Sequence, residues 1–420
     1  METDLKHSIH TEIDNQNGAT ATTPPRTKPD RKKPTSSGNI SKQMNTIKET
    51  TQAALEEKQR NLHGKKGPEL LRVKDAMWQQ YLYHDATGKH PYFAYTPSTY
   101  HRGTAVPLLV LLHGCTQKAA DFATGTGMNQ LAEQYGFIAL YPQQKRTSNQ
   151  TLCWNWFKSS HQFRDRGEPA LITHMVQAIC ENTSQWTIDS RRIYVVGASA
   201  GAAMAVILGA TYPDIFAAIG VHSGVEYQAV TNIIGGLKLV LGGGPDPVKQ
   251  GQKAFEAMGS YRRIVPTIVC QGTRDRIVPP INGDQVVQQW MQTNHLASQG
   301  LYVADFNNPT TTSSGQVPEG LAYTVSTWED HSGKEIQQYW KIEGLGHAWS
   351  GGNPDVSYTD PRGPNASEVM YHFFMKHTLG EAIRYEAAPR RSIKQTMSNF
   401  LGRFKRKRKT YSDESITNSH

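Results

Sequence analysis

The chain carries the pentapeptide Gly197-Ala198-Ser199-Ala200-Gly201 between a β-branched and aromatic run at 192–196 and an alanine-rich apolar run at 202–208. These flanking runs predict a strand before the pentapeptide and a helix after it. In that setting G-x-S-x-G is typical of a nucleophile elbow, a tight turn that exposes a serine at the positive end of a helix. The alternative is a small-residue turn in any parallel sheet. The strand and the helix together favour Ser199 as a nucleophile.

A serine hydroxyl needs a base to take its proton, and the elbow predicts an acid and then a histidine further along the chain. Asp275 follows the predicted strand 267–271, and His347 lies on a glycine-rich loop after the predicted strand 338–343. Open α/β sheets place their sites at this carboxyl end of the strands. We therefore predict Asp275 as the acid and His347 as the base. The other candidates for the acid, which lie less cleanly at a strand end, are Asp284 and Glu343.

A continuous apolar run predicts a strand at 108–112 that is buried on both faces. It ends in His113-Gly114, a pair that resembles the oxyanion loop of esterases. We predict that the backbone N–H groups of Cys115 and Ala200 form the oxyanion hole, which stabilises the charge on a tetrahedral intermediate. His113 is expected to order the loop and not to transfer protons.

Several motifs along the chain together resemble one known family. They are, in order, L-H-G-C-T-Q at 112–117, C-W-N-W-F at 153–157, G-E-P-A at 167–170, G-A-S-A-G at 197–201 and H-A-W-S-G-G at 347–352. With the stretch 357–367, they resemble the esterase family of poly(3-hydroxybutyrate) depolymerases. The resemblance covers about residues 88 to 378. It implies an α/β-hydrolase fold, no metal or organic cofactor, and the roles already given to Ser199, Asp275 and His347.

The same resemblance implies a serine carboxylesterase that hydrolyses 3-hydroxyacyl esters, from poly(3-hydroxybutyrate) or its oligomers, through an acyl-enzyme. The alternative among enzymes is a feruloyl or acetylxylan esterase, because the family includes both. An alternative of another class is an interaction protein that uses the fold as a platform on a granule or membrane. Trp154 and Trp156 follow a predicted strand, so we expect their rings to contact an apolar part of the substrate. The alternative is that these rings pack the loop onto the core.

The 420 residues are predicted to form one catalytic domain with two tails. Residues 1–68 hold few large apolar residues and a Pro-rich charged run, so they are predicted to be disordered. Residues 69–380 alternate strands and helices, which indicates a mostly parallel sheet with helices on both faces. The predicted strands are 91–96, 108–112, 137–141, 192–196, 217–222, 267–271 and 338–343. The predicted helices are 125–135, 168–182, 200–211 and 282–294, with a hairpin at 321–342 and a glycine-rich cover or loop at 225–252.

Part of the net charge of +9 is concentrated in residues 381–420, where R-F-K-R-K-R-K occupies 403–409. The apolar residues around this run share one helical face. A basic amphipathic helix of this kind binds an anionic membrane or a polyester granule, and the alternative is a solvated tail. No recognisable motif accompanies the basic run, so we do not expect nucleic-acid binding.

Four cysteines in a chain of this length do not make a disulfide scaffold. Cys180 and Cys270 are predicted to be inert core residues. Cys115 and Cys153 lie in motif loops, and they either pair in an oxidising compartment or remain reduced. No apolar run follows the first residues and none elsewhere is long enough to span a membrane. The default expectation is therefore a cytoplasmic protein, although similar family members are often extracellular.

Overall fold

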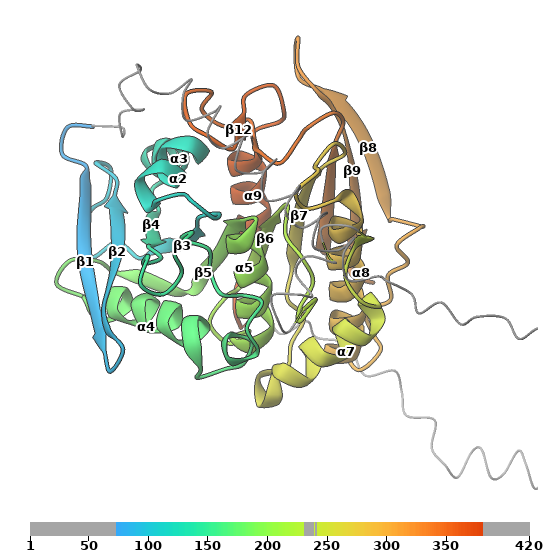
Figure 1. Cartoon of the computed structure of the whole chain (residues 1–420), viewed down its shortest axis with the longest axis horizontal. Coiled ribbons are helices and arrows are strands. Elements are labelled where there is room, and N and C mark those ends of the chain that lie inside the picture. Colours follow the sequence, from blue (N-terminus) through green and yellow to red (C-terminus); the bar gives the residue numbers. More distant parts are fainter. Residues whose placement is uncertain (1–72, 231–238, 240–241, 381–420) are drawn as a thin grey trace, which may run out of the picture. The chain divides into compact units, whose positions relative to one another are not determined.

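The computed structural model describes residues 73–230, 239 and 242–380. A ten-stranded sheet runs through this part in the order β1-β2-β4-β3-β5-β6-β7-β10-β9-β8 (Figure 1). The strands are β1 (Met77–Asp85), β2 (Gly88–Thr96), β3 (Val106–Leu112), β4 (Ile138–Pro142), β5 (Ile188–Ala198), β6 (Ala218–His222), β7 (Thr267–Gly272), β8 (Thr311–Gln316), β9 (Ala322–Glu329) and β10 (Glu335–Ile342). The strands from β4 to β10 in this order are parallel. Antiparallel strands extend both edges.

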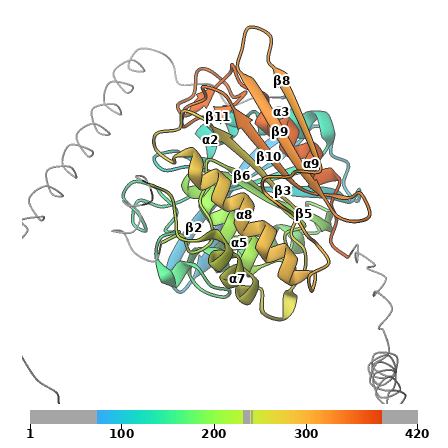
Figure 2. The same cartoon turned by 90° about the vertical axis from the view of Figure 1, so that its right-hand side faces the viewer.

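Helices cover both faces of this sheet, as Figures 1 and 2 show. One face carries α4 (Gly167–Glu181), α5 (Ala200–Thr211), α7 (Pro247–Ala257) and α8 (Pro280–Ala297). The other face carries α2 (Ala119–Thr126), α3 (Met128–Tyr135) and α9 (Ala366–Met375). The predicted α/β class with a mostly parallel, doubly covered sheet is therefore confirmed. Within the described residues, no helix has both the length and the hydropathy needed to span a bilayer.

The apolar run of β3 explains why the sheet is buried on both faces. Successive side chains of a strand point to opposite faces. Leu108, Val110 and Leu112 pack into the core under α4 and α5, whereas Leu109 and Leu111 pack into the core under α2 and α9. Each buried side chain contributes about 1.5–3 kcal/mol. The absence of polar alternation in this run is thus a direct consequence of the two helical layers.

Most predicted elements coincide with observed ones. Every predicted strand overlaps a strand of the sheet, the helix predicted at 200–211 has those bounds, and the predicted hairpin is formed by β9 and β10. The prediction of one helix at 125–135 is wrong. Gly127 has a φ of 68° and ends α2, and a separate helix, α3, begins at Met128. The left-handed backbone at this glycine interrupts the helical hydrogen bonds.

The sequence analysis missed β1, β8, α7 and α9. Strand β8 reads T-T-S-S-G-Q and has no apolar residue, so its pairing with β9 rests on main-chain hydrogen bonds. Helix α7 lies partly within the segment that was interpreted as a cover or loop, and Asp246 caps it by accepting a hydrogen bond from the Val248 N–H. The predictions for the tails, 1–68 and 381–420, fall outside the described residues and stay predictions.

His377 lies just after α9, and its ring is buried. Neither ring nitrogen has a hydrogen-bond partner. Burial, with smaller contributions from nearby cations, lowers the pKa of His377 to about 3. The native state therefore keeps this ring neutral at pH values where an unfolded chain, with a histidine pKa of about 6.5, takes up a proton.

We predict that this difference makes the protein acid-sensitive. The contribution of His377 to stability is fully present above pH ~6.5 and is lost as pH falls, at up to ~1.4 kcal/mol per pH unit. His377→Leu should therefore flatten the dependence of the urea-unfolding free energy on pH between about 7 and 4. The matched control is His84→Leu at an exposed position, which should keep the wild-type slope. A wild-type slope in His377→Leu would contradict the prediction.

Candidate active site

Ser199 lies in the turn between β5 and α5. Its backbone has a φ of 56° and a ψ of −119°, a conformation that non-glycine residues rarely adopt. The Ser199 N–H donates to the carbonyl oxygen of His222 at the end of β6, at 2.9 Å. The Ser199 carbonyl accepts the first helical hydrogen bond, from the Ala203 N–H at 3.0 Å. The turn is therefore held from the neighbouring strand and from the helix that follows.

The glycines of the pentapeptide are required by close backbone contacts. A Cβ atom on Gly197 would lie 2.3 Å from the carbonyl group of Gly201. A Cβ atom on Gly201 would lie 2.0 Å from the carbonyl oxygen of Leu112, at the end of β3. A Cβ atom on Gly114 would lie 3.5 Å from the Cβ of Ser199. The elbow is therefore packed against β3, and the predicted oxyanion loop lies beside the serine.

Asp275 and His347 are hydrogen-bonded to each other. The distance from His347 Nδ1 to Asp275 Oδ2 is 2.8 Å, and the aspartate side chain is fully buried. The other carboxylate oxygen, Oδ1, accepts the N–H groups of Ile277 and Val278 at 2.9 and 2.8 Å. The backbone thus fixes the carboxylate in the loop after β7, and the carboxylate fixes the imidazole.

The surroundings of Asp275 keep it ionised. Burial alone would raise the pKa of this carboxyl, but the hydrogen bond from His347 and those from the Val278 and Ile277 N–H groups outweigh burial and lower the pKa below its ordinary value. An ionised Asp275 requires a proton on His347 Nδ1, so the Nε2 atom is the one left to act as a base.

The rival acids have other partners. Asp284 accepts a hydrogen bond from the Tyr339 hydroxyl at 2.9 Å and pairs with Lys341 at 2.9 Å. Glu343 accepts a hydrogen bond from the Thr273 hydroxyl at 3.1 Å. The geometry therefore favours Asp275 as the partner of His347.

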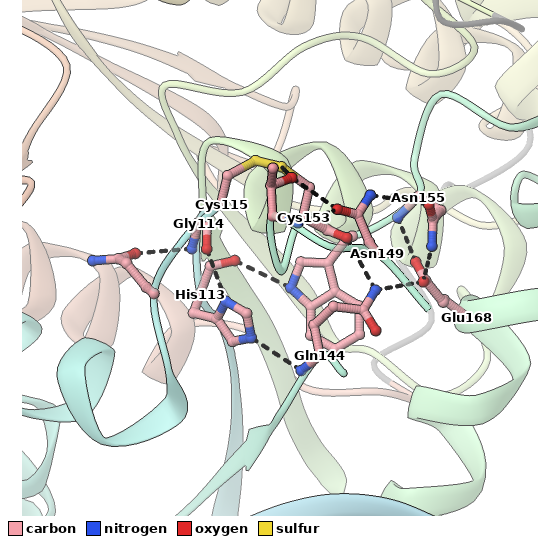
Figure 3. The surroundings of a disulfide bond; sticks show 11 residues. His113, Gly114, Cys115, Gln144, Asn149, Cys153, Asn155 and Glu168 are labelled. Carbon is pink, nitrogen blue, oxygen red and sulfur yellow. Dashed lines mark hydrogen bonds between the residues drawn. A yellow bond between two sulfur atoms is a disulfide. The ribbon is translucent and has the colours of Figure 1, made fainter. Parts of the chain in front are cut away.

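The loop after β3 is ordered by His113, as Figure 3 shows. Its Nδ1 donates to the Gly114 carbonyl at 2.8 Å, and its Nε2 accepts the Gln144 N–H at 3.1 Å. Burial lowers the pKa of His113 to about 4, so the ring stays neutral and keeps both bonds. This geometry agrees with the expectation that His113 orders the loop.

The predicted oxyanion donors come from the loop after β3 and from the start of α5. Ala200 is the first residue of α5, where backbone N–H groups lack intrahelical acceptors. The N–H groups on both sides of Cys115 have acceptors: Gly114 donates to Gln117 Oε1 in the same loop, and Thr116 donates to the Thr151 carbonyl in the loop after β4. These bonds orient the peptide that carries the Cys115 N–H. The oxyanion role of Cys115 and Ala200 stays a prediction.

Cys115 and Cys153 form a disulfide bond, which decides between the two alternatives left open by the sequence. The bond joins the loop after β3 to the loop after β4 (Figure 3). Disulfides persist in oxidising compartments. Cys180 and Cys270 are free thiols. Burial raises the pKa of Cys180 to about 11 and that of Cys270 still further, so both are poor nucleophiles.

A buried carboxylate, Glu168, holds the loop after β4, to which the disulfide joins Cys115 (Figure 3). It accepts the Asn155 N–H at 2.6 Å, the Asn155 side-chain amide at 2.6 Å and the Gln144 amide at 2.5 Å. The same Gln144 amide also donates to the Cys153 carbonyl at 3.0 Å. Glu168 therefore holds the loop that the disulfide connects to Cys115. The sequence analysis found Glu168 within a motif but gave it no role.

The substrate-binding role predicted for Trp154 is wrong in this structure. Trp154 is 1% exposed, and its indole N–H donates to the His113 carbonyl at 3.1 Å. This bond supports the predicted oxyanion loop. Trp156 is only half-buried and packs on an apolar cluster that includes Ala203, Val225 and Leu239. Ala203 lies one helical turn after Ser199, so Trp156 stays a candidate for contact with the substrate.

Within the part of the chain that the structure describes, no group of three or more His, Cys, Asp or Glu side chains is arranged to hold a metal ion.

His222 is a further residue at the carboxyl edge of the sheet that the sequence analysis missed. It directly ends the predicted strand 217–222, so its place at the carboxyl edge was a usable signal.

The fold and the geometry of this edge define the class of α/β hydrolases. The family model described as "Esterase PHB depolymerase" matches residues 92–302. This match spans half of the chain, and the protein belongs to that family.

The chain is similar to curated proteins that are named as polyester depolymerases and to others named as acetylxylan esterases. Poly(3-hydroxyalkanoate) depolymerase C of Paucimonas lemoignei is 32% identical over 244 residues, which cover 57% of this chain and 54% of the relative. Poly(3-hydroxybutyrate) depolymerase of Ralstonia pickettii is 28% identical over 280 residues, covering 65% and 54%. A probable acetylxylan esterase A of Aspergillus fumigatus is 28% identical over 263 residues, covering 61% and 65%. The chain thus spans about half the length of the depolymerases it matches.

A solved structure confirms the predicted α/β-hydrolase fold. The acetyl xylan esterase from Aspergillus awamori aligns with a TM-score of 0.57 and 22% identity. The alignment covers 71% of this chain and 99% of the solved one. At this level of identity the likeness concerns the fold alone.

We predict that the disulfide supports both stability and turnover. Cys153→Ser should lower the unfolding free energy by about 2–4 kcal/mol, because the unfolded chain gains freedom. It should also lower kcat for p-nitrophenyl butyrate by roughly 10- to 100-fold, because the predicted oxyanion loop would lose its covalent link to the loop after β4 and small displacements of catalytic groups are costly. The control is Cys180→Ser, outside the bond. Wild-type turnover in Cys153→Ser would show that the tether is dispensable.

Proposed function

We propose that this protein is a serine carboxylesterase. The observation that carries the proposal is the 2.8 Å hydrogen bond between His347 Nδ1 and the buried Asp275. It lies at the same sheet edge as the strained turn at Ser199, since β5 and β7 both flank β6. The relatives named above, which are called depolymerases and esterases, support the same reaction class.

In the proposed mechanism the Ser199 Oγ attacks the ester carbonyl carbon while His347 Nε2 takes the hydroxyl proton. Asp275 stabilises the imidazolium that forms. The N–H groups of Cys115 and Ala200 bind the oxyanion of the tetrahedral intermediate. His347 then returns the proton to the leaving alcohol. Water, activated by the same histidine, releases the acid from the acyl-enzyme.

The proposed substrates are 3-hydroxyacyl esters, as poly(3-hydroxybutyrate) or its oligomers. Two depolymerases among the relatives support this choice. The apolar cluster beside Ser199, formed by Ala203, Val225 and neighbouring rings, suits an apolar acyl group. Feruloyl or acetylxylan ester hydrolysis is the second candidate, because acetylxylan esterases match the chain with similar coverage.

We predict that a fluorophosphonate probe labels the wild-type protein and does not label Ser199→Ala. The substitution should lower ester hydrolysis by about 10⁴-fold or more, because the covalent route is lost. Retention of a tenth of the activity would contradict the role of Ser199. An unlabelled wild type would favour the interaction-protein alternative. A panel of amorphous polyhydroxybutyrate, its oligomers, methyl ferulate and acetylated xylan then decides between the substrates.

We further propose that the basic segment 403–409 and the apolar residues before it bind an anionic surface. Deletion of 390–420 should weaken binding to anionic lipid vesicles and to polyester granules, and should leave hydrolysis of soluble esters nearly unchanged. Binding of the full chain should fall as salt rises, because exposed charges are screened over ~10 Å at 0.1 M. Equal binding by the full and the shortened chains would show that the tail is only a solvated extension.

A further inference from the structure

His222 occupies the position where the serine turn and the histidine loop meet. It is the last residue of β6 and is 1% exposed. In the sheet it pairs with Ala198 of β5, next to Ser199, and with Cys270 of β7. Its carbonyl oxygen accepts the Ser199 N–H at 2.9 Å. The main chain of His222 therefore holds the strained turn.

The side chain of the same residue holds the loop that carries His347. His222 Nε2 accepts the N–H of Ser350, three residues after His347, at 3.1 Å. The ring also stacks on Trp349, with centroids 4.9 Å apart and planes inclined by 25°. Trp349 is fixed in turn, since its indole N–H donates to the Ser367 hydroxyl at 3.0 Å. One residue thus contacts the backbone of both loops.

The chemistry of the ring suits this task. Burial, with a smaller contribution from His347, lowers the pKa of His222 to about 3. The imidazole is therefore neutral, and its Nε2 lone pair remains available to the Ser350 N–H. Its Nδ1 carries the proton and lies 3.3 Å from the Ser223 hydroxyl. The ring cannot serve as a second general base while Nε2 is engaged in this bond.

The segment before His347 is held by the loop after β7, and the bond to His222 adds a restraint on the segment after it. Gly344, with a φ of 76°, and Gly346 flank Leu345 just before His347. A Cβ on Gly346 would meet no atom within 4 Å, whereas the carbonyl groups of this segment pack beside Gly272, and the Leu345 carbonyl accepts the Arg274 N–H at 3.0 Å. The bond from Ser350 to His222 fixes the other side of His347 to the strand that also fixes Ser199. Through these contacts His222 links the backbone at Ser199 to the backbone that follows His347.

We propose that His222 is a positioning residue that sets the placement of His347 relative to Ser199. The proposal rests on the proposed roles of these two residues as base and nucleophile. It assigns His222 no contact with substrate. The residue acts through the acceptor atom Nε2. A side chain long enough to place an acceptor at the position of Nε2 should therefore replace histidine, whereas a shorter side chain or an apolar side chain should not.

The test compares His222→Gln, His222→Asn and His222→Leu. A glutamine oxygen can reach the place of Nε2, whereas the asparagine oxygen reaches only the place of Nδ1. Leucine removes the acceptor and leaves the Ser350 N–H without one. The rate of reaction with a fluorophosphonate is resolved into the maximal rate and the concentration for half-maximal rate, and needs no knowledge of the natural ester. Thermal unfolding shows that each variant is folded.

We expect the leucine and asparagine variants to lose about 10²-fold in the maximal rate, the loss typical of a displacement of about 1 Å. The half-maximal concentration should change little, because binding of the probe is not altered. The maximal rate of the glutamine variant should be at least about tenfold higher than that of the asparagine and leucine variants. If the leucine variant does not fold, the asparagine and glutamine pair gives the same comparison.

Two results would overturn the proposal. One is a folded leucine or asparagine variant that reacts within about threefold of the wild-type maximal rate. The other is a glutamine variant as slow as the asparagine variant, which would reduce His222 to a packing role. A wild-type protein that does not react at Ser199 would instead contradict the proposed function, so the two failures are distinguishable.

Discussion

At Ser199 the chain turns from β5 into α5 with a φ of 56°, and the rest of the site is arranged around this turn. A backbone of this kind costs about 1–3 kcal/mol and persists only where its surroundings over-determine it. Here Gly201 lies directly against the Leu112 carbonyl, and the His222 carbonyl accepts the Ser199 N–H. The ends of β3, β5 and β6 must therefore stay aligned for the serine to be presented.

Buried carboxylates fix the loops on both sides of this turn. An unpaired charge in the protein interior is costly, so such groups are retained where several N–H donors surround them. Asp275 receives hydrogen bonds from two backbone N–H groups and from His347. Glu168 receives them from Asn155 and Gln144. Each carboxylate fixes a loop: Asp275 holds the ring of His347, the proposed base, and Glu168 holds the loop that the disulfide joins to Cys115.

The neutral histidines at this edge serve as connectors. His113 joins Gly114 to Gln144, and His222 joins β6 to Ser350. Burial lowers the pKa of both rings, so each keeps one donor and one acceptor nitrogen through the neutral pH range. Of His113, His222 and His347, it is His347 that bonds to a carboxylate through Nδ1, and its side chain is 12% exposed. Burial and hydrogen-bond partners therefore distinguish His347, the proposed base, from the two histidines that connect segments of the backbone.

The amino-acid sequence by itself determined the central strands and the positions of Ser199 and His347, because apolar runs and a glycine-flanked serine are local signals. The sequence also favoured Asp275 as the acid, and the tertiary structure showed that its carboxylate, and not that of Asp284 or Glu343, bonds to the histidine. The tertiary structure alone decided that Cys115 pairs with Cys153. It also showed that Trp154 is buried, that His222 contacts Ser350, and that residues of β8 form an edge strand. These features join residues distant along the chain. Their contacts follow from the order of strands in the sheet, and no local pattern in the sequence encodes that order.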